Sequence, residues 1–114
     1  MKEFEYNNIT FYVGQSAKEN WALLDNAKAE NDNYIWFHLN SLPSPYVIMW
    51  SSISDLDNKS VKELLIYGAT LCKENSKYKN YKCLKIIYTI VKKLTKTDIE
   101  GEVDITGKIK VIKL

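Results

Sequence analysis

The chain has 114 residues, a formal net charge of +2, 46% hydrophobic residues and 12% aromatic residues. This length and apolar content predict one domain, residues 1–114, with a single core. No apolar stretch approaches the roughly 20 residues that cross a bilayer, and the acidic, alternating N-terminus has no secretory signal core. We therefore expect a cytoplasmic protein with no membrane partner.

Cysteine and histidine are scarce in the chain. Cys72, Cys83 and His38 are the only residues of these types, and a structural zinc site needs four ligands. A lone disulfide is a weak expectation in a chain with a full-sized core, so we expect buried free thiols. Acidic residues such as Asp55 and Asp57 form no convincing carboxylate pair with a second polar partner. The sequence predicts no metal, no cofactor and no catalytic residue.

The net charge hides an uneven distribution along the chain. Residues 1–57 carry a net −5, residues 58–97 carry +8 from ten lysines and two glutamates, and residues 98–114 carry −1. All 16 basic residues are lysines, so the bidentate arginine fork that reads guanine is absent. The lysine-rich segment suggests an anionic partner. If that partner is a nucleic acid, attraction to its phosphate backbone and stacking on its bases should hold it. The alternative is that these lysines simply face solvent.

The first third of the chain predicts a hairpin followed by a helix. Two β-branched and aromatic runs, 4–6 and 9–13, flank an Asn-Asn pair that tolerates the positive φ of a tight turn. Ser16 and Glu19 then have the spacing of a capping box, which predicts a helix over residues 17–28. The apolar stripe of this helix should lie on the sheet.

The middle of the chain predicts two strands and a second helix. Residues 34–39 are too apolar to leave one strand face in water, so this strand should be central. A proline-rich loop leads to a strand over 46–50, antiparallel to it. Ser60 opens a second capping-box pattern, which predicts a helix from about Val61 to Glu74. Gly68 in this helix indicates close packing.

The last third predicts strands. Residues 84–89 form one, residues 90–98 have no clear assignment, and 101–105 and 108–112 alternate around a Thr-Gly pair as a closing hairpin or as two short strands. The order of elements predicts an α+β fold, a mostly antiparallel mixed sheet with two main helices packed on one face.

Six short motifs occur in an order that covers nearly the whole chain. They are Val13–Asn20, Ile35–His38, Ser44–Met49, Ala69 with Asn75-Ser76, Tyr88-Thr89 with Lys92-Lys93, and Gly101. In this order the chain resembles the NFACT-R family, found in NFACT proteins of ribosome-associated quality control and in small coiled-coil-containing eukaryotic relatives. The resemblance implies an RNA-binding domain with no reaction of its own, whose larger relatives engage tRNA and the large ribosomal subunit.

The chain departs from the family pattern at four positions where charge matters. The family commonly has arginine at Gln15, an acid at Tyr34, histidine at Tyr46 and a basic residue at Trp50. These departures leave open whether the binding mode of the family is kept or redirected in this chain.

The turn at Gly14 and Gln15 is the first candidate site. Free amides at a helix start favour phosphate, and Lys18 adds a positive charge there. The alternative is that the capping box already satisfies these amides. Asn20 and Ser44 lie within motifs that carry the family resemblance, and the resemblance implies that they contribute to RNA binding.

The predicted central strand holds the second candidate site. Trp36 and His38 share one face of it, and if the helices cover the other face, these rings and Trp50 form an exposed platform for stacking bases. The alternative is that Trp36 belongs to the core. His38 has no partner spaced for acid-base chemistry, so we interpret it as a strand-end residue or a surface contact.

The third candidate site is the lysine-rich segment, in which Tyr78 and Tyr81 supply rings among the cations. A solvated loop is the alternative. The site lysines are Lys73, Lys77, Lys79, Lys82, Lys92 and Lys93, with Lys85 and Lys96 in the same segment.

We expect RNA, either tRNA or rRNA, as the partner ahead of DNA. The first alternative is a protein-interaction module that docks on a ribosomal or quality-control partner, which an exposed apolar patch around Trp36, Trp50 and Tyr46 would favour. A small-ligand enzyme would instead need a deep pocket that holds His38 and an acid.

Overall fold

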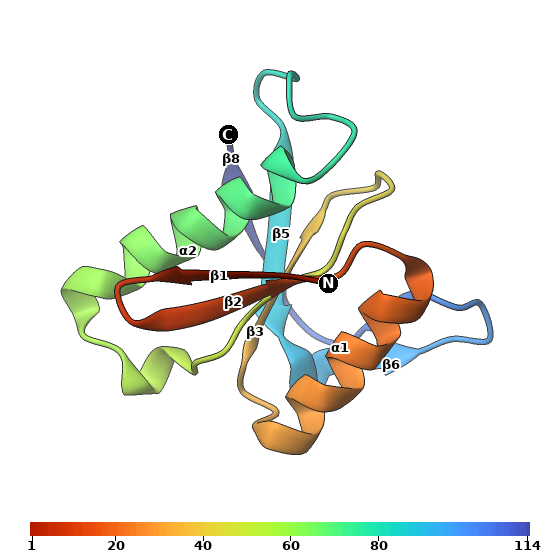
Figure 1. Cartoon of the computed structure of the whole chain (residues 1–114), viewed down its shortest axis with the longest axis horizontal. Coiled ribbons are helices and arrows are strands. Elements are labelled where there is room, and N and C mark those ends of the chain that lie inside the picture. Colours follow the sequence, from red (N-terminus) through yellow and green to blue (C-terminus); the bar gives the residue numbers. More distant parts are fainter.

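The computed structural model describes the whole chain, residues 1–114. The elements in chain order are β1 (Lys2–Tyr6), β2 (Ile9–Val13), α1 (Ala17–Glu30), β3 (Ile35–Leu39), β4 (Val47–Met49), the 3₁₀ helix η1 (Ile53–Asp55), α2 (Asn58–Glu74), β5 (Lys85–Ile90), the 3₁₀ helix η2 (Val91–Lys93), β6 (Leu94–Lys96), β7 (Val103–Ile105) and β8 (Lys110–Lys113). Figure 1 shows their arrangement. Neither helix is long and apolar enough to cross a membrane.

The main sheet has six strands in the order β1-β2-β4-β3-β5-β8, and β6 and β7 form a second, two-stranded sheet. Every pairing is antiparallel. Strand β3 lies between β4 and β5, with Trp36 opposite Ile48 on one side and Thr89 on the other. The predicted α+β class and the central position of this strand are confirmed.

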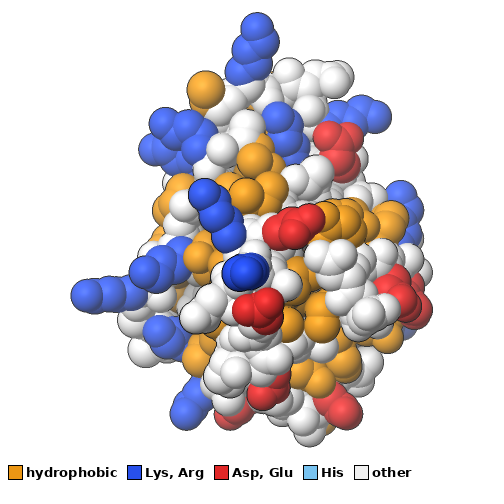
Figure 2. All heavy atoms as spheres, turned by 90° about the vertical axis from the view of Figure 1, so that its left-hand side faces the viewer, with side chains coloured by type: hydrophobic (Ala, Val, Ile, Leu, Met, Phe, Trp, Pro, Cys, Tyr) orange, Lys and Arg blue, Asp and Glu red, His pale blue; other side chains and the backbone are white.

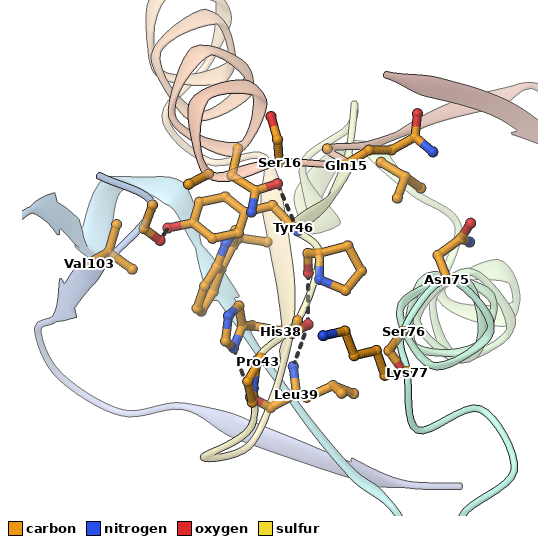
Figure 3. Close-up of a pocket in the computed structure, with 18 of the residues that line it drawn as sticks. Gln15, Ser16, His38, Leu39, Pro43, Tyr46, Asn75, Ser76, Lys77 and Val103 are labelled. Carbon is orange, nitrogen blue, oxygen red and sulfur yellow. Dashed lines mark hydrogen bonds between the residues drawn. The ribbon is translucent and has the colours of Figure 1, made fainter. Parts of the chain in front are cut away.

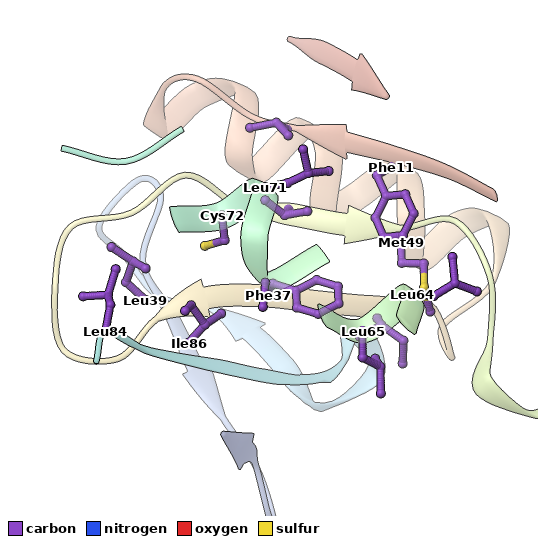
Figure 4. Close-up of a cluster of buried hydrophobic side chains, with 14 residues drawn as sticks. Phe11, Phe37, Leu39, Met49, Leu64, Leu65, Leu71, Cys72, Leu84 and Ile86 are labelled. Atoms are coloured by element: carbon purple, nitrogen blue, oxygen red, sulfur yellow. The ribbon is translucent and has the colours of Figure 1, made fainter. Parts of the chain in front are cut away.

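The two helices pack on opposite faces of the sheet (Figure 1). On one face, α2 packs on a cluster that contains Phe37, Val47 and Met49 (Figure 4). On the other face, α1 and the small sheet pack on a cluster that contains Trp36 and Ile48. The prediction of both helices on one face is therefore wrong, because β3 and β4 carry apolar side chains on both faces and each face needs a cover.

The close approach expected at Gly68 is confirmed. A Cβ atom at this position would lie 2.3 Å from Cζ of Phe37, and no pair of carbon atoms tolerates that distance. Because Gly68 has no side chain, α2 packs directly on the Phe37 ring of β3.

The first turn and the first helix cap form as predicted. Asn7 and Asn8 have φ of 51° and 63°, the left-handed geometry that a two-residue hairpin needs. Ser16 Oγ accepts a hydrogen bond from the Glu19 amide at 3.1 Å. The Glu19 carboxylate reaches back and accepts from the Gln15 amide at 3.0 Å.

Helix α2 starts earlier than the capping-box pattern at Ser60 predicts. Its N-cap is Asp57, whose carboxylate accepts a hydrogen bond from the Lys59 amide at 3.3 Å. Asp57 is itself a strong cap residue, and a start at this position adds three residues to the helix. Ser60 lies inside the first turn.

The C-terminal residues form two short strands in different sheets, so the alternative of a closing hairpin is wrong. Strand β7 pairs with β6, and β8 pairs with β5 at the edge of the main sheet. The unassigned residues 90–98 supply η2 and β6. Both cysteines are free. Cys72 is buried as predicted, but Cys83 is exposed, because it lies in the loop before β5 with a φ of 57°.

We predict that Asp57→Ala lowers the free energy of unfolding by about 1 kcal/mol, because it removes the side-chain acceptor of the α2 cap. Ser60→Ala is the matched control and should change stability by less than about 0.5 kcal/mol. Urea unfolding followed by circular dichroism measures both. A larger loss in the Ser60 variant would contradict the position of the cap.

Candidate nucleic-acid site

An open cleft of about 820 Å³ lies where the start of α1, the end of β3, the β3–β4 loop and the end of α2 meet (Figure 3). The structure brings predicted site residues from distant parts of the sequence to this cleft. They are Gly14, Gln15, Asn20, Trp36, His38, Ser44, Lys77 and Lys79. Lys18, Lys73, Lys82, Lys92 and Lys93 do not line it.

The N-terminus of α1 forms one wall of the cleft. The capping box satisfies the amides of Gln15 and Glu19, which donate to Glu19 and Ser16. For these two amides the alternative, that capping leaves no free donor, is correct. The amides of Ala17 and Lys18 make no hydrogen bond within the chain. Unpaired first-turn amides point out of the helix end and carry its positive dipole, so this wall suits an anion.

Gly14 and Asn20 position the backbone of Tyr46. The Gly14 amide donates to the Tyr46 carbonyl at 2.9 Å, and Asn20 Oδ1 accepts from the Tyr46 amide at 3.2 Å. A Cβ at Gly14 would lie 2.1 Å from Asn20 Oδ1. Only glycine leaves room for this arrangement, so both residues hold β4 against the start of α1.

Tyr46 connects the walls of the cleft, a role that the sequence analysis missed. Its ring packs edge-on against Trp36 and His38, with centroids 5.5 and 5.8 Å apart. Its hydroxyl donates to the Gly101 carbonyl at 2.6 Å. Burial raises the pKa of the Tyr46 phenol to about 12. The sequence pointed to Tyr46 as part of the Ser44–Met49 motif and as a departure from the family pattern, but not as a residue that connects elements.

Trp36 is not part of an exposed stacking platform. Only 1% of it is exposed, because α1 and the small sheet cover this face. Trp50 is half-buried against Tyr12 and Tyr34. The platform prediction is therefore wrong. Tyr46 is also 1% exposed, so Trp36, Trp50 and Tyr46 do not form the exposed apolar patch that would have favoured a protein-interaction module. Trp36 acts instead as the surface on which His38 stacks, at 5.1 Å between ring centroids.

His38 presents one ring nitrogen to the cleft. Its Nδ1 lies 2.7 Å from the Leu39 carbonyl, and because a carbonyl only accepts, Nδ1 carries the proton. Nε2 is then an unprotonated acceptor. Burial lowers the pKa of His38, an effect that the hydrogen bond to Leu39 partly opposes. The ring is therefore neutral near pH 7 and offers an acceptor for a ligand N–H group.

The lysines of the positive segment are spread over the molecule. Lys77 and Lys79 line the cleft, opposite Glu100 and Glu102. Lys92 and Lys93 follow the other end of β5, a strand of six residues that spans about 20 Å. Lys93 lies beside the second sheet, where its carbonyl accepts from the Thr106 amide at 2.9 Å. Figure 2 shows one face on which lysines are most frequent at the top and left, while acidic side chains lie in the centre, on the right and at the bottom. The +8 segment is thus not a single patch.

The remaining predicted lysines lie outside the cleft. Lys73 donates to the terminal oxygen of Leu114 at 3.3 Å, and Lys82 is exposed in the connection before β5. In that connection Tyr81 is 57% exposed, and Tyr78 packs edge-on against its ring at 5.1 Å. Tyr81 is the exposed aromatic ring next to the lysines.

Two comparisons with known proteins bear on this site. The model of the family described as the NFACT protein RNA binding domain matches residues 3–113. The solved structure of the C-terminal part of the fibronectin/fibrinogen-binding protein from Streptococcus suis is similar, with a TM-score of 0.80 and 21% sequence identity. The match covers 98% of this chain and 44% of that chain, and it shows a shared fold. No curated protein matches the chain.

We predict that the His38 imidazole titrates below its ordinary pKa of 6.5. The chain has one histidine, so its ring protons give a single NMR titration curve. In concentrated urea the midpoint should return to about 6.5. Because the folded-state pKa is the lower one, the free energy of unfolding should fall as the pH drops through 6.5. A folded-state midpoint at or above 6.5 would contradict the burial of this ring.

Proposed function

Because the chain belongs to the NFACT protein RNA binding domain family, we propose that it binds unpaired RNA at the cleft beside α1 and catalyses no reaction on it. The observation that carries the proposal is the family match over residues 3–113. The residues that line the cleft add groups that suit phosphate and base, and these come from both halves of the chain.

Phosphate is the first group that the cleft recognises. The free amides of Ala17 and Lys18 at the helix start favour negative charge, and Lys77 and Lys79 supply cations from the opposite wall. Glu100 and Glu102 line the same cleft, and their charge disfavours phosphates on that side. The backbone of the RNA therefore runs between α1 and the lysine-rich connection.

Bases are recognised by stacking and by one hydrogen bond. Tyr81 offers an exposed ring beside the lysines, and stacking tolerates every base. The unprotonated Nε2 of His38 accepts from an amino or imino group of a base that enters the cleft. Without arginine the chain has no bidentate reader of guanine, so its sequence preference is weak.

The absence of a carboxylate partner supports a binding role over a catalytic one. His38 uses Nδ1 on a backbone carbonyl, and no acid contacts the ring. An acid-base catalyst is ordinarily oriented and balanced by a second titratable group.

The wider setting of the proposal rests on the family resemblance. We propose one domain over residues 1–114 that works in the cytoplasm, in translation or ribosome-associated quality control. Its RNA is tRNA or rRNA, with DNA as a weaker ligand and ribosome-associated proteins as neighbours.

We predict that RNA affinity falls steeply with salt and that the cleft lysines set the slope. Each phosphate contact on a single strand contributes about −0.7 to the slope of log affinity against log salt. Lys77→Ala with Lys79→Ala should flatten the slope by about 1.4 if both touch phosphate. Fluorescence anisotropy with a labelled unpaired oligoribonucleotide measures this slope across a series of salt concentrations.

The charge-matched control is Lys59→Ala with Lys62→Ala, which removes the same charge near the start of α2, at residues that do not line the cleft. It should leave the slope nearly unchanged. Tyr81→Ala should weaken binding by about 1 to 3 kcal/mol with little change in slope. If both lysine pairs flatten the slope equally, attraction is diffuse and the cleft is not the site. If neither pair matters, the chain docks on protein instead.

A further inference from the structure

A second open groove, of about 530 Å³, separates α2 from the β5–β8 end of the sheet. One side is formed by residues of α2 from Asn58 to Ile66, and the other by Val111 and Ile112 of β8 and Tyr88 of β5. The α2 side spans about 12 Å, or two helical turns. No residue of this groove lines the nucleic-acid cleft.

Exposed aliphatic side chains gather at this groove. Ile53 and Ile66 are each 40% exposed and line it from the helix side. Ile112 lines it from β8, where it pairs with Ile86 on the sheet face that α2 covers. Scattered exposed aliphatics are ordinary, but a contiguous set indicates a binding surface. Strand β8 is also an edge of the sheet, so no further strand pairs beside it.

Lysines without ion-pair partners border the apolar residues. Lys62 lines the groove, and Lys59 lies one helical turn before it on α2. Lys110 is paired directly opposite Tyr88, so its side chain extends on the same sheet face. The two ion pairs of the chain are Met1–Glu19 and Lys96–Asp25, and neither uses these lysines. The nearby carboxylates form hydrogen bonds with other groups: Asp55 accepts from Ser52, Asp57 caps α2, and Glu63 accepts from Tyr6.

We propose that this groove binds a short acidic amphipathic helix of a partner protein. Two or three aliphatic side chains of the helix, spaced one turn apart, fill the space between α2 and β8, as in other helix-in-groove complexes. Aspartates or glutamates beside them pair with Lys59, Lys62 and Lys110. The lysine border sets specificity and the apolar floor supplies the affinity.

Charge argues against two other occupants. A second copy of the chain, docked through the same groove about a two-fold axis, would place lysines against lysines. RNA would gain phosphate contacts at the border but would leave the exposed Ile53 and Ile66 without suitable partners. An acidic helix satisfies both the apolar floor and its charged border.

The test is selection of a phage-displayed library of random peptides of about 12 residues, enough for three helical turns, on the intact chain. Ile53→Glu with Ile66→Glu provides the counter-selection, and both positions are exposed enough to accept the change without unfolding. Ile99→Glu is the matched control, because Ile99 is 59% exposed and lies outside the groove. Circular dichroism and RNA affinity, which the double variant should retain, verify its fold.

The enriched peptides should carry aliphatic residues at helical spacing with flanking acids. As synthetic peptides they should bind the double variant at least tenfold more weakly than the wild type and the Ile99→Glu chain equally well. The proposal is overturned if enriched peptides are basic, if none depends on the groove, or if the wild-type chain dimerises through it and the double variant does not.

Discussion

Burial of both faces of β3 and β4 is the constraint on which the rest of the molecule depends. Trp36 and Ile48 point to one side, and Phe37 and Val47 point to the other. A sheet with two apolar faces must be covered twice, so α1 and α2 lie on opposite sides. This arrangement brings the start of α1 and the end of α2 to one end of the central strands, where the cleft forms. The apolar groove arises because α2 does not reach across to β8.

Tyr46 links the elements that surround the cleft. Its backbone is held by Gly14 and Asn20, its ring covers Trp36, and its hydroxyl reaches the loop at Gly101. Through its backbone and its side chain, one residue therefore connects the end of β2, α1, β3 and the loop before β7. The unpaired amides of α1 and the free nitrogen of His38 are presented to solvent by groups that are themselves rigid, which is what recognition of a flexible strand requires.

The sequence predicted local features well because adjacent residues determine them. The Asn7-Asn8 turn, the Ser16 cap and the close approach at Gly68 all follow from one or two residue types. The sequence did not predict which face of the sheet each helix covers or how far apart the lysines lie. The burial of Trp36 depends on which face α1 covers, and alternation along β3 cannot supply that information. The separation of Lys92 from Lys77 follows from the length of β5, and charge counts along the chain ignore such distances.

The central claim is that the cleft beside α1, rather than the lysine content as a whole, receives RNA. Chemical-shift mapping of the ¹⁵N-labelled chain with a short unpaired oligoribonucleotide tests it most directly. The amides of Ala17, Lys18, Lys77 and Lys79 and the His38 ring should shift most, while Ile66, Lys92 and Val111 stay unchanged. Shifts spread evenly over all exposed lysines, or confined to the α2–β8 groove, would contradict the account.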